Sequence, residues 1–170
     1  MRIAGWRSAA FVLCVTTLVA SVAVPAQAAG IVRVEAESYT AQRGTRVVPA
    51  PYPADGLMVE VSNGDWLRYD RVTAERVQFT LFCFASPAPA GTEVATLEVR
   101  VGSVWTAPVQ TIAVRTNIGD GIKEWAGGGP FPDGVHTVYL RVRQPRGARP
   151  FTLDYLLLSE FPPPPSLNCP

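Results

Sequence analysis

The sequence predicts an all-β domain, a β-sandwich or jelly roll, and three observations carry this prediction. Apolar and polar residues alternate with a period of two in several segments, as in antiparallel sheets that rest one face on a core. Clusters of Gly, Pro, Asn and Asp separate these segments. Beyond the first 29 residues, no segment shows the periodicity of an amphipathic helix. Many short strands separated by such turns form two packed sheets.

The alternation identifies the strands in the middle and the end of the chain. Residues 77–85 alternate but become apolar on both faces late in the run, which is typical of a buried strand. Residues 95–101 (ATLEVRV) and 135–143 (VHTVYLRVR) each have one apolar and one polar face. Turn sequences lie between the strands, namely PAPYPADG, SNGD, SPAPAG, NIGDG, GGGPFPDG and QPRGARP.

The two ends of the chain differ from the predicted domain. Residues 1–29 have two arginines, a short apolar run and the small residues of a cleavage site, which predicts a signal peptide and a secreted protein with no membrane anchor. Residues 30–160 form one predicted domain. Residues 161–170 contain four consecutive prolines and no periodicity, which predicts an extended tail.

Charge and cysteine content exclude some classes of function. Removal of Arg2 and Arg7 with the signal leaves 13 basic residues against 14 acidic ones, so the domain lacks the basic field of a general nucleic-acid binder. Cys83 and Cys169 remain. A secreted protein permits them to pair, but the alternation around Cys83 favours a buried thiol and a separate tail cysteine.

Glu35 and Glu37, in the segment VEAES, are the first candidates for chemistry. In a strand, residues two apart share one face, so the pair suits a cation site, the acid and base of a glycosidase, or a solvated surface. Acid and base must flank the scissile bond, whereas two side chains on one strand point in parallel. Cation binding is therefore favoured over catalysis, because a hard cation needs several oxygens converging from one side.

Three motifs, in order, resemble the family 6 carbohydrate-binding modules. They are VEAESYTAQRG, SNGDWLRYD and PFTLDYLLL, and they span almost the whole chain after the signal. The resemblance implies a galactose-binding-like jelly roll, a structural calcium ion, and sugar binding without catalysis. It also implies a glycoside hydrolase as companion, here on a separate polypeptide. In the family, carboxylates at the start of the first strand and in the last strand hold the calcium, which assigns it to Glu35, Glu37 and Asp154.

The resemblance places the sugar in a loop cleft where two aromatic rings enclose one sugar ring. At the corresponding positions this chain has Glu60, Ile122 and Trp125, and Thr152 replaces the polar residue that fixes the sugar hydroxyls. Only Trp125 keeps the family residue type. The ligand is therefore expected to differ from the family's usual ones.

Two questions stay open at the level of sequence: the role of a group of arginines, and the choice among three functions. Arg141, Arg143, Arg146 and Arg149 suit uronic or sulfated sugars through forked hydrogen bonds, although a solvated outer face is the simpler interpretation. The leading function is binding of a polysaccharide. The alternatives are a structural or protein-interaction domain that lost its sugar site, and a small glycosidase that uses Glu35.

Overall fold

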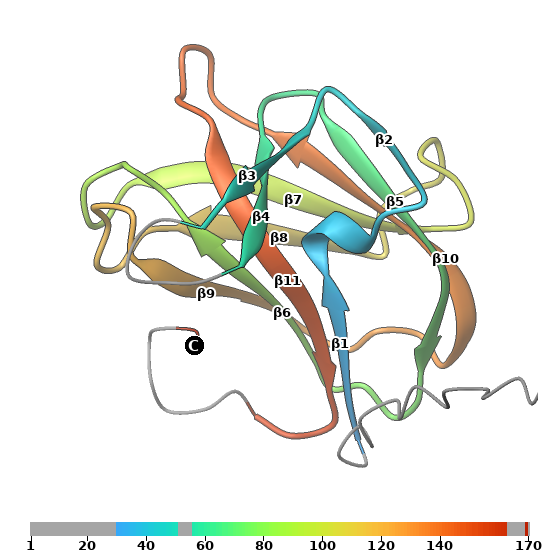
Figure 1. Cartoon of the computed structure of the whole chain (residues 1–170). Helices are drawn as coiled ribbons and strands as arrows, with labels where there is room; N and C mark the ends of the chain where they lie inside the picture. The colour runs from blue at the N-terminus through green and yellow to red at the C-terminus, as the bar shows by residue number, and fades with distance from the viewer. Residues whose placement is uncertain (1–29, 51–55, 163–168, 170) are drawn as a thin grey trace, which may run out of the picture.

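The computed structural model describes residues 30–50, 56–162 and 169, and these form a sandwich of two antiparallel sheets (Figure 1). The predicted β-sandwich is therefore confirmed. The predicted signal, residues 1–29, and most of the predicted tail lie outside the described residues. Within the described part of the chain, no helix is long and apolar enough to cross a membrane.

The first sheet has the order β3–β4–β11–β6–β9, and β1 also pairs with β11. The second sheet has the order β2–β5–β10–β7–β8. The first sheet consists of β1 (Ile31–Glu35), β3 (Arg46–Pro49), β4 (Leu57–Val61), β6 (Phe79–Ala85), β9 (Lys123–Gly128) and β11 (Phe151–Ser159). The second consists of β2 (Ala41–Arg43), β5 (Trp66–Ala74), β7 (Glu93–Val101), β8 (Gln110–Arg115) and β10 (Gly134–Arg143).

The core lies between the two sheets and is built by the alternation that the sequence shows. In β10, Val138, Leu140 and Val142 are buried in the core, while the residues between them face outward. In β5, Leu67 and Tyr69 do the same. Strands β5 and β10 thus contribute one face to the core and leave the other outward, whereas β6 and β11 are buried along most of both faces.

The first predicted strand is shorter than expected. It ends at Glu35, and a single 3₁₀ turn, η1 (Ala36–Ser38), follows it. The Tyr69 hydroxyl donates a hydrogen bond of 2.9 Å to the Ala36 carbonyl, which fixes this turn against β5. Because a 3₁₀ turn replaces the period of two, Glu35 and Glu37 do not share one face, and that prediction was wrong.

Cys83 and Cys169 form a disulfide with a Cα–Cα distance of 5.9 Å. The expectation of a separate buried thiol is therefore corrected. Cys83 lies on the outer face of β6, where its neighbours Tyr155, Trp125 and Leu157 form a small apolar cluster around Cys169. The sequence around Cys83 is apolar because the disulfide and this cluster cover it, not because it lies in the main core.

Candidate functional site

A row of outward side chains crosses one end of the first sheet. Direct strand pairing places Arg46 opposite Glu60, Glu60 opposite Thr152, and Thr152 opposite Ala85. Residues directly opposite in adjacent strands project on the same face, with Cβ atoms about 5 Å apart. Two of the four predicted sugar-site residues, Glu60 and Thr152, therefore lie side by side although they are far apart in the sequence.

A hollow of about 280 Å³ lies over this row. Its lining includes Glu60, Thr152, Phe151, Pro87 and Gly121. Ile122, the third predicted residue, follows Gly121 directly and is 41% exposed. Two of the four predicted residues, Glu60 and Thr152, thus line one hollow, and Ile122 directly follows a residue of its lining.

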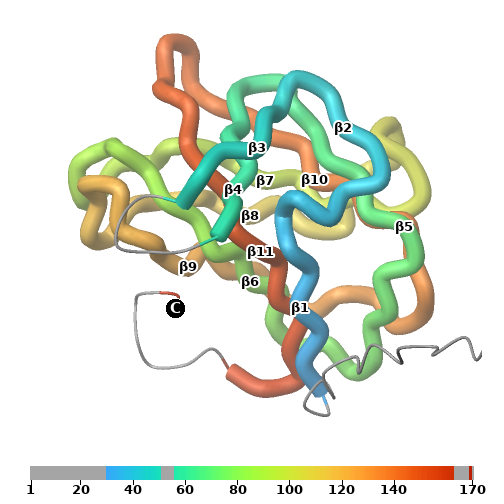
Figure 2. Tube along the Cα trace, viewed as in Figure 1, coloured from blue at the N-terminus to red at the C-terminus, as the bar shows by residue number. Residues whose placement is uncertain are grey.

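Two loops form the rim of this hollow, and Figure 2 shows them together at the left edge of the fold. Gly121 donates a backbone hydrogen bond of 2.8 Å to the Ser86 carbonyl, which joins the loop after β8 to the loop after β6. The buried carboxylate of Glu124 accepts hydrogen bonds from the backbone amides of residues 117, 118 and 119. A buried carboxylate that accepts several backbone amides fixes a loop firmly, so the rim is preorganised.

Polar groups at the hollow are already ordered. Arg46 Nε and Nη2 donate to the two carboxylate oxygens of Glu60 at 2.7 and 3.0 Å, and this ion pair raises the pKa of Arg46. The Thr152 hydroxyl donates to the Ala85 carbonyl at 3.3 Å. We call this pair of hydrogen bonds the Arg46–Glu60 fork. It leaves the Glu60 carboxylate able to accept, and the Arg46 guanidinium able to donate, further hydrogen bonds at the edge of the hollow, and such groups suit the hydroxyl groups of a sugar.

Trp125 does not reach the hollow. It lies directly opposite Cys83 in the β6–β9 pairing, and its ring packs edge-on against Tyr155 with the centroids 5.5 Å apart. Its Nε1 is buried without a hydrogen-bond partner among the described residues. The prediction that Trp125 presents a ring to sugar in the loop cleft is therefore corrected: Trp125 covers the disulfide instead.

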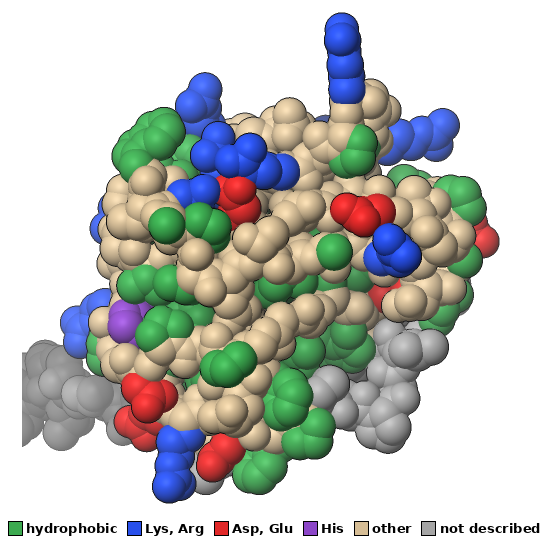
Figure 3. Space-filling view, turned by 180° about the vertical axis from the view of Figure 1, so that it is seen from behind, with side chains coloured by type: hydrophobic (Ala, Val, Ile, Leu, Met, Phe, Trp, Pro, Cys, Tyr) green, Lys and Arg blue, Asp and Glu red, His purple; other side chains and the backbone are tan. Residues whose placement is uncertain are grey.

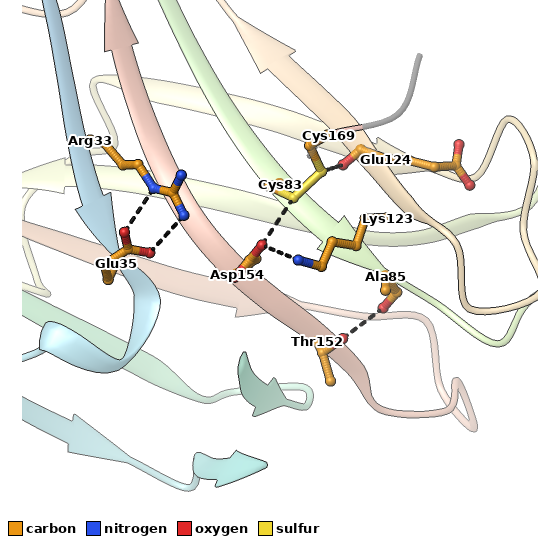
Figure 4. Close-up of a disulfide and its surroundings, with 9 residues drawn as sticks. All are labelled: Arg33, Glu35, Cys83, Ala85, Lys123, Glu124, Thr152, Asp154 and Cys169. Atoms are coloured by element: carbon orange, nitrogen blue, oxygen red, sulfur yellow. Dashed lines mark hydrogen bonds and ion pairs between the residues drawn. A yellow bond between two sulfur atoms is a disulfide. The ribbon is translucent and has the colours of Figure 1, made fainter. Parts of the chain in front are cut away.

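The predicted calcium ligands do not meet at one point. Glu35 forms an ion pair with Arg33 at 2.7 Å, and Asp154 forms one with Lys123 at 2.8 Å. Figure 4 shows Glu35 turned toward Arg33 and Asp154 turned toward Lys123. Glu37 Oε2 is buried and has no partner within the described ranges. In the part of the chain that the structure describes, no group of three acidic, His or Cys side chains is arranged to hold a metal ion.

The fit to calcium is therefore poor, for a physical reason. Asp154 and Lys123 are largely buried, with side chains 9% and 12% exposed. An ammonium ion already balances the Asp154 charge, and a second cation beside it would be repelled.

Sequence analysis considered Arg141 and Arg143 but did not place them beside the outward aromatic residues of the second sheet. Trp66 and Tyr139 lie there with ring centroids 5.8 Å apart, and Arg68 lies directly opposite Tyr139. The signal was present in the alternation of WLRYD and VYLRVR. It could not be assembled without the register between β5 and β10.

The fold and the hollow define a β-sandwich of the type that presents loops and sheet faces to a ligand. A comparison with protein-family profiles matches residues 35–160 to the carbohydrate binding module (family 6). The chain belongs to this family, whose members are binding modules. A comparison with curated protein sequences found no significant match.

Solved structures agree with this assignment. A β-1,3-glucan-binding module from Bacillus halodurans has a TM-score of 0.64 and 23% identity, over 75% of this chain and 94% of its own. A family 6 module from Clostridium cellulolyticum in complex with xylose has a TM-score of 0.64 and 26% identity, over 76% of this chain and 97% of its own. An arabinoxylan arabinofuranohydrolase from Bacillus subtilis has a TM-score of 0.62 and 23% identity, over 75% of this chain and 26% of its own.

Proposed function

We propose that this chain is a secreted, non-catalytic module that binds a polysaccharide in the loop hollow beside Glu60 and Thr152. The observation that carries the proposal is the direct pairing of these two residues beneath a preorganised rim. The substitutions at the family's sugar-contacting positions favour a ligand that differs from the usual ones. The first polymers to test are still a β-1,3-glucan and xylan, because one relative binds β-1,3-glucan and another was solved in complex with xylose.

Binding there depends on hydrogen bonds more than on stacking. The hollow contains Phe151, but its side chain is 1% exposed, and Trp125 points elsewhere. Hydrogen bonds to a charged group contribute about 1.5–3 kcal/mol each. The Arg46–Glu60 fork is therefore the main expected source of affinity and orientation.

The test is affinity electrophoresis through gels that contain β-1,3-glucan or xylan. We expect retardation of the wild-type domain, and we expect Glu60→Ala to lower the affinity about tenfold or more. Glu160→Ala is the matched control, because Glu160 also pairs with an arginine, Arg76, at 3.8 Å, but lies outside the hollow. Equal affinity of both variants for either polymer would contradict the proposed site.

The rival function, a structural or protein-interaction domain, has one observation in its favour. The described lining of the hollow offers no exposed aromatic ring, and stacking on such rings is a common source of sugar affinity. Absence of retardation with neutral, acidic and sulfated glycans would support this rival.

The proposal extends to the setting of the module. The predicted signal peptide would export the chain, and the Cys83–Cys169 disulfide supports an oxidising compartment. The proposed companion is a separate glycoside hydrolase that the module holds near its substrate. Determination of the N-terminus of the protein recovered from the culture medium tests export, with cleavage expected near residue 29.

A further inference from the structure

A second hollow, of about 300 Å³, lies directly beside the loop hollow that contains Glu60. Ser86 and Pro87 line both hollows, and Arg149 of the second hollow is followed in the chain by Pro150 of the first. Ligand sites have volumes from about 300 Å³ upward, so each hollow has room for roughly one sugar unit. Two adjacent hollows of this size suit two linked units of one polysaccharide.

Hydrogen bonds fix the walls of the second hollow. Gln144 Nε2 donates to the carbonyls of Val94 and Arg149 at 3.1 and 2.9 Å, which joins the start of β7 to the loop after β10. The hydroxyl of Thr116, a fully buried residue, donates to the Pro89 carbonyl at 2.6 Å and fixes the loop after β6. A site whose walls are fixed before binding loses less conformational entropy when the ligand arrives.

The second hollow combines an apolar lining with one unbalanced positive charge. Glu93 and Arg149 are its two charged residues. Glu93 forms an ion pair with Arg115 at 3.3 Å. Arg149 is exposed and forms no ion pair with a carboxylate among the described residues. The apolar part of the lining comes from Pro87, Ala88, Pro89, Val94 and Ala148.

The position of Arg149 distinguishes it from the other arginines of its sequence segment. Arg141 and Arg143 lie on β10, where Arg143 binds Glu98. Arg146 and Arg149 lie in the loop between β10 and β11, at the top of the fold in Figure 1. Figure 3, seen from behind, shows Lys and Arg side chains projecting from the upper edge of the molecule. Arg149 is the member of this group that lines a hollow next to the proposed sugar site.

These features suit a sugar unit that carries an anionic group. A guanidinium binds the oxygens of a carboxylate or sulfate through two parallel, charge-assisted hydrogen bonds. An apolar lining with a few polar groups holds the carbon face of a ligand while the polar groups orient it. A neutral unit in the second hollow would make the apolar contacts alone, whereas an acidic unit would also bind Arg149.

We propose that the second hollow binds an acidic unit of the polysaccharide whose neutral backbone occupies the loop hollow, with Arg149 binding the carboxylate or sulfate group of that unit. The inference rests on the function proposed above and names the class of polysaccharide: a neutral chain, such as xylan, with acidic branches. Such a ligand fits a loop hollow without an exposed aromatic ring, because a charge-assisted contact beside the hollow supplies part of the affinity.

The experiment is isothermal titration of the disulfide-intact protein with three xylan oligosaccharides of equal length. One carries a glucuronic acid branch, the second is the same molecule with its carboxyl group reduced to an alcohol, and the third carries a sulfate ester. We expect an acidic oligosaccharide to bind about tenfold more tightly than the reduced one, since a hydrogen bond to a charged group contributes about this factor. The tighter of the two acidic ligands identifies the preferred anionic group.

Three variants make the result specific. Arg149→Gln should remove the preference for the acidic ligand and bind the reduced oligosaccharide as the wild type does. Arg146→Gln is the matched control, because it removes the same charge from the same exposed loop but does not line the second hollow; it should keep the preference. Arg149→Lys keeps the charge without the planar fork and should keep only part of the preference. The melting temperature of each variant verifies that it is folded.

The outcomes separate this inference from the proposed function. Equal binding of the acidic and reduced oligosaccharides, or binding of β-1,3-glucan alone, in either case dependent on Glu60, would overturn the second hollow and leave the proposed function intact. Equal loss of the preference in Arg146→Gln and Arg149→Gln would show a non-specific charge effect and would also overturn the second hollow. Binding of no glycan would overturn both proposals.

Discussion

Replacement of Cys169 by serine removes the covalent link between the end of the chain and β6, and its cost can be worked from the structure. The disulfide joins residues 86 positions apart. In the chain-entropy treatment, a closed loop of this size stabilises the fold by about 4.6 kcal/mol at 25 °C. The contact of Cys169 with Trp125 and Tyr155 adds to this stabilisation because it buries apolar surface.

The assay is urea unfolding of wild type and Cys169→Ser, with and without a reducing agent. We expect the free energy of unfolding to fall by about 3–5 kcal/mol, within the range for loss of a native disulfide. The thermal midpoint should fall by roughly 10–20 °C for a domain of this size. Reduction should bring wild type to the value of the variant and leave the variant unchanged. A loss below about 1 kcal/mol would refute the argument, since the loop closure could not then constrain the unfolded chain.

Three further predictions concern ions, pH and backbone conformation. A chelator should leave the thermal midpoint unchanged, because Glu35 and Asp154 already have cationic partners; a clear fall would restore the predicted calcium site. Hydrogen bonds from Thr40 and Arg68 lower the pKa of Asp70. The ionised Asp70 carboxylate therefore stabilises the fold at neutral pH, and this contribution is lost as the pH falls below about 4. The difference in unfolding free energy between wild type and Asp70→Asn should shrink over that range. Gly44→Ala should lower the free energy of unfolding, measured in urea, by about 1–3 kcal/mol. The reason is that the added Cβ would lie 1.9 Å from Asp65 Oδ1. Gly64→Ala is the control and should cost less, because Gly64 faces open space.

The sequence predicted the sandwich because alternation is a local property. A strand such as β10 shows its buried and exposed faces in its own residues, and the register with its neighbours is not needed. The positions of Glu60 and Thr152 came from the resemblance to the family, and the structure places them directly opposite each other.

Features that depend on register or on distant contacts were not predicted. Trp125 has the residue type and the position of a sugar-stacking tryptophan, but the pairing of β9 with β6 turns it toward Cys83. The position of Cys169 follows a proline run without periodicity, so local pattern could not show that it returns to β6.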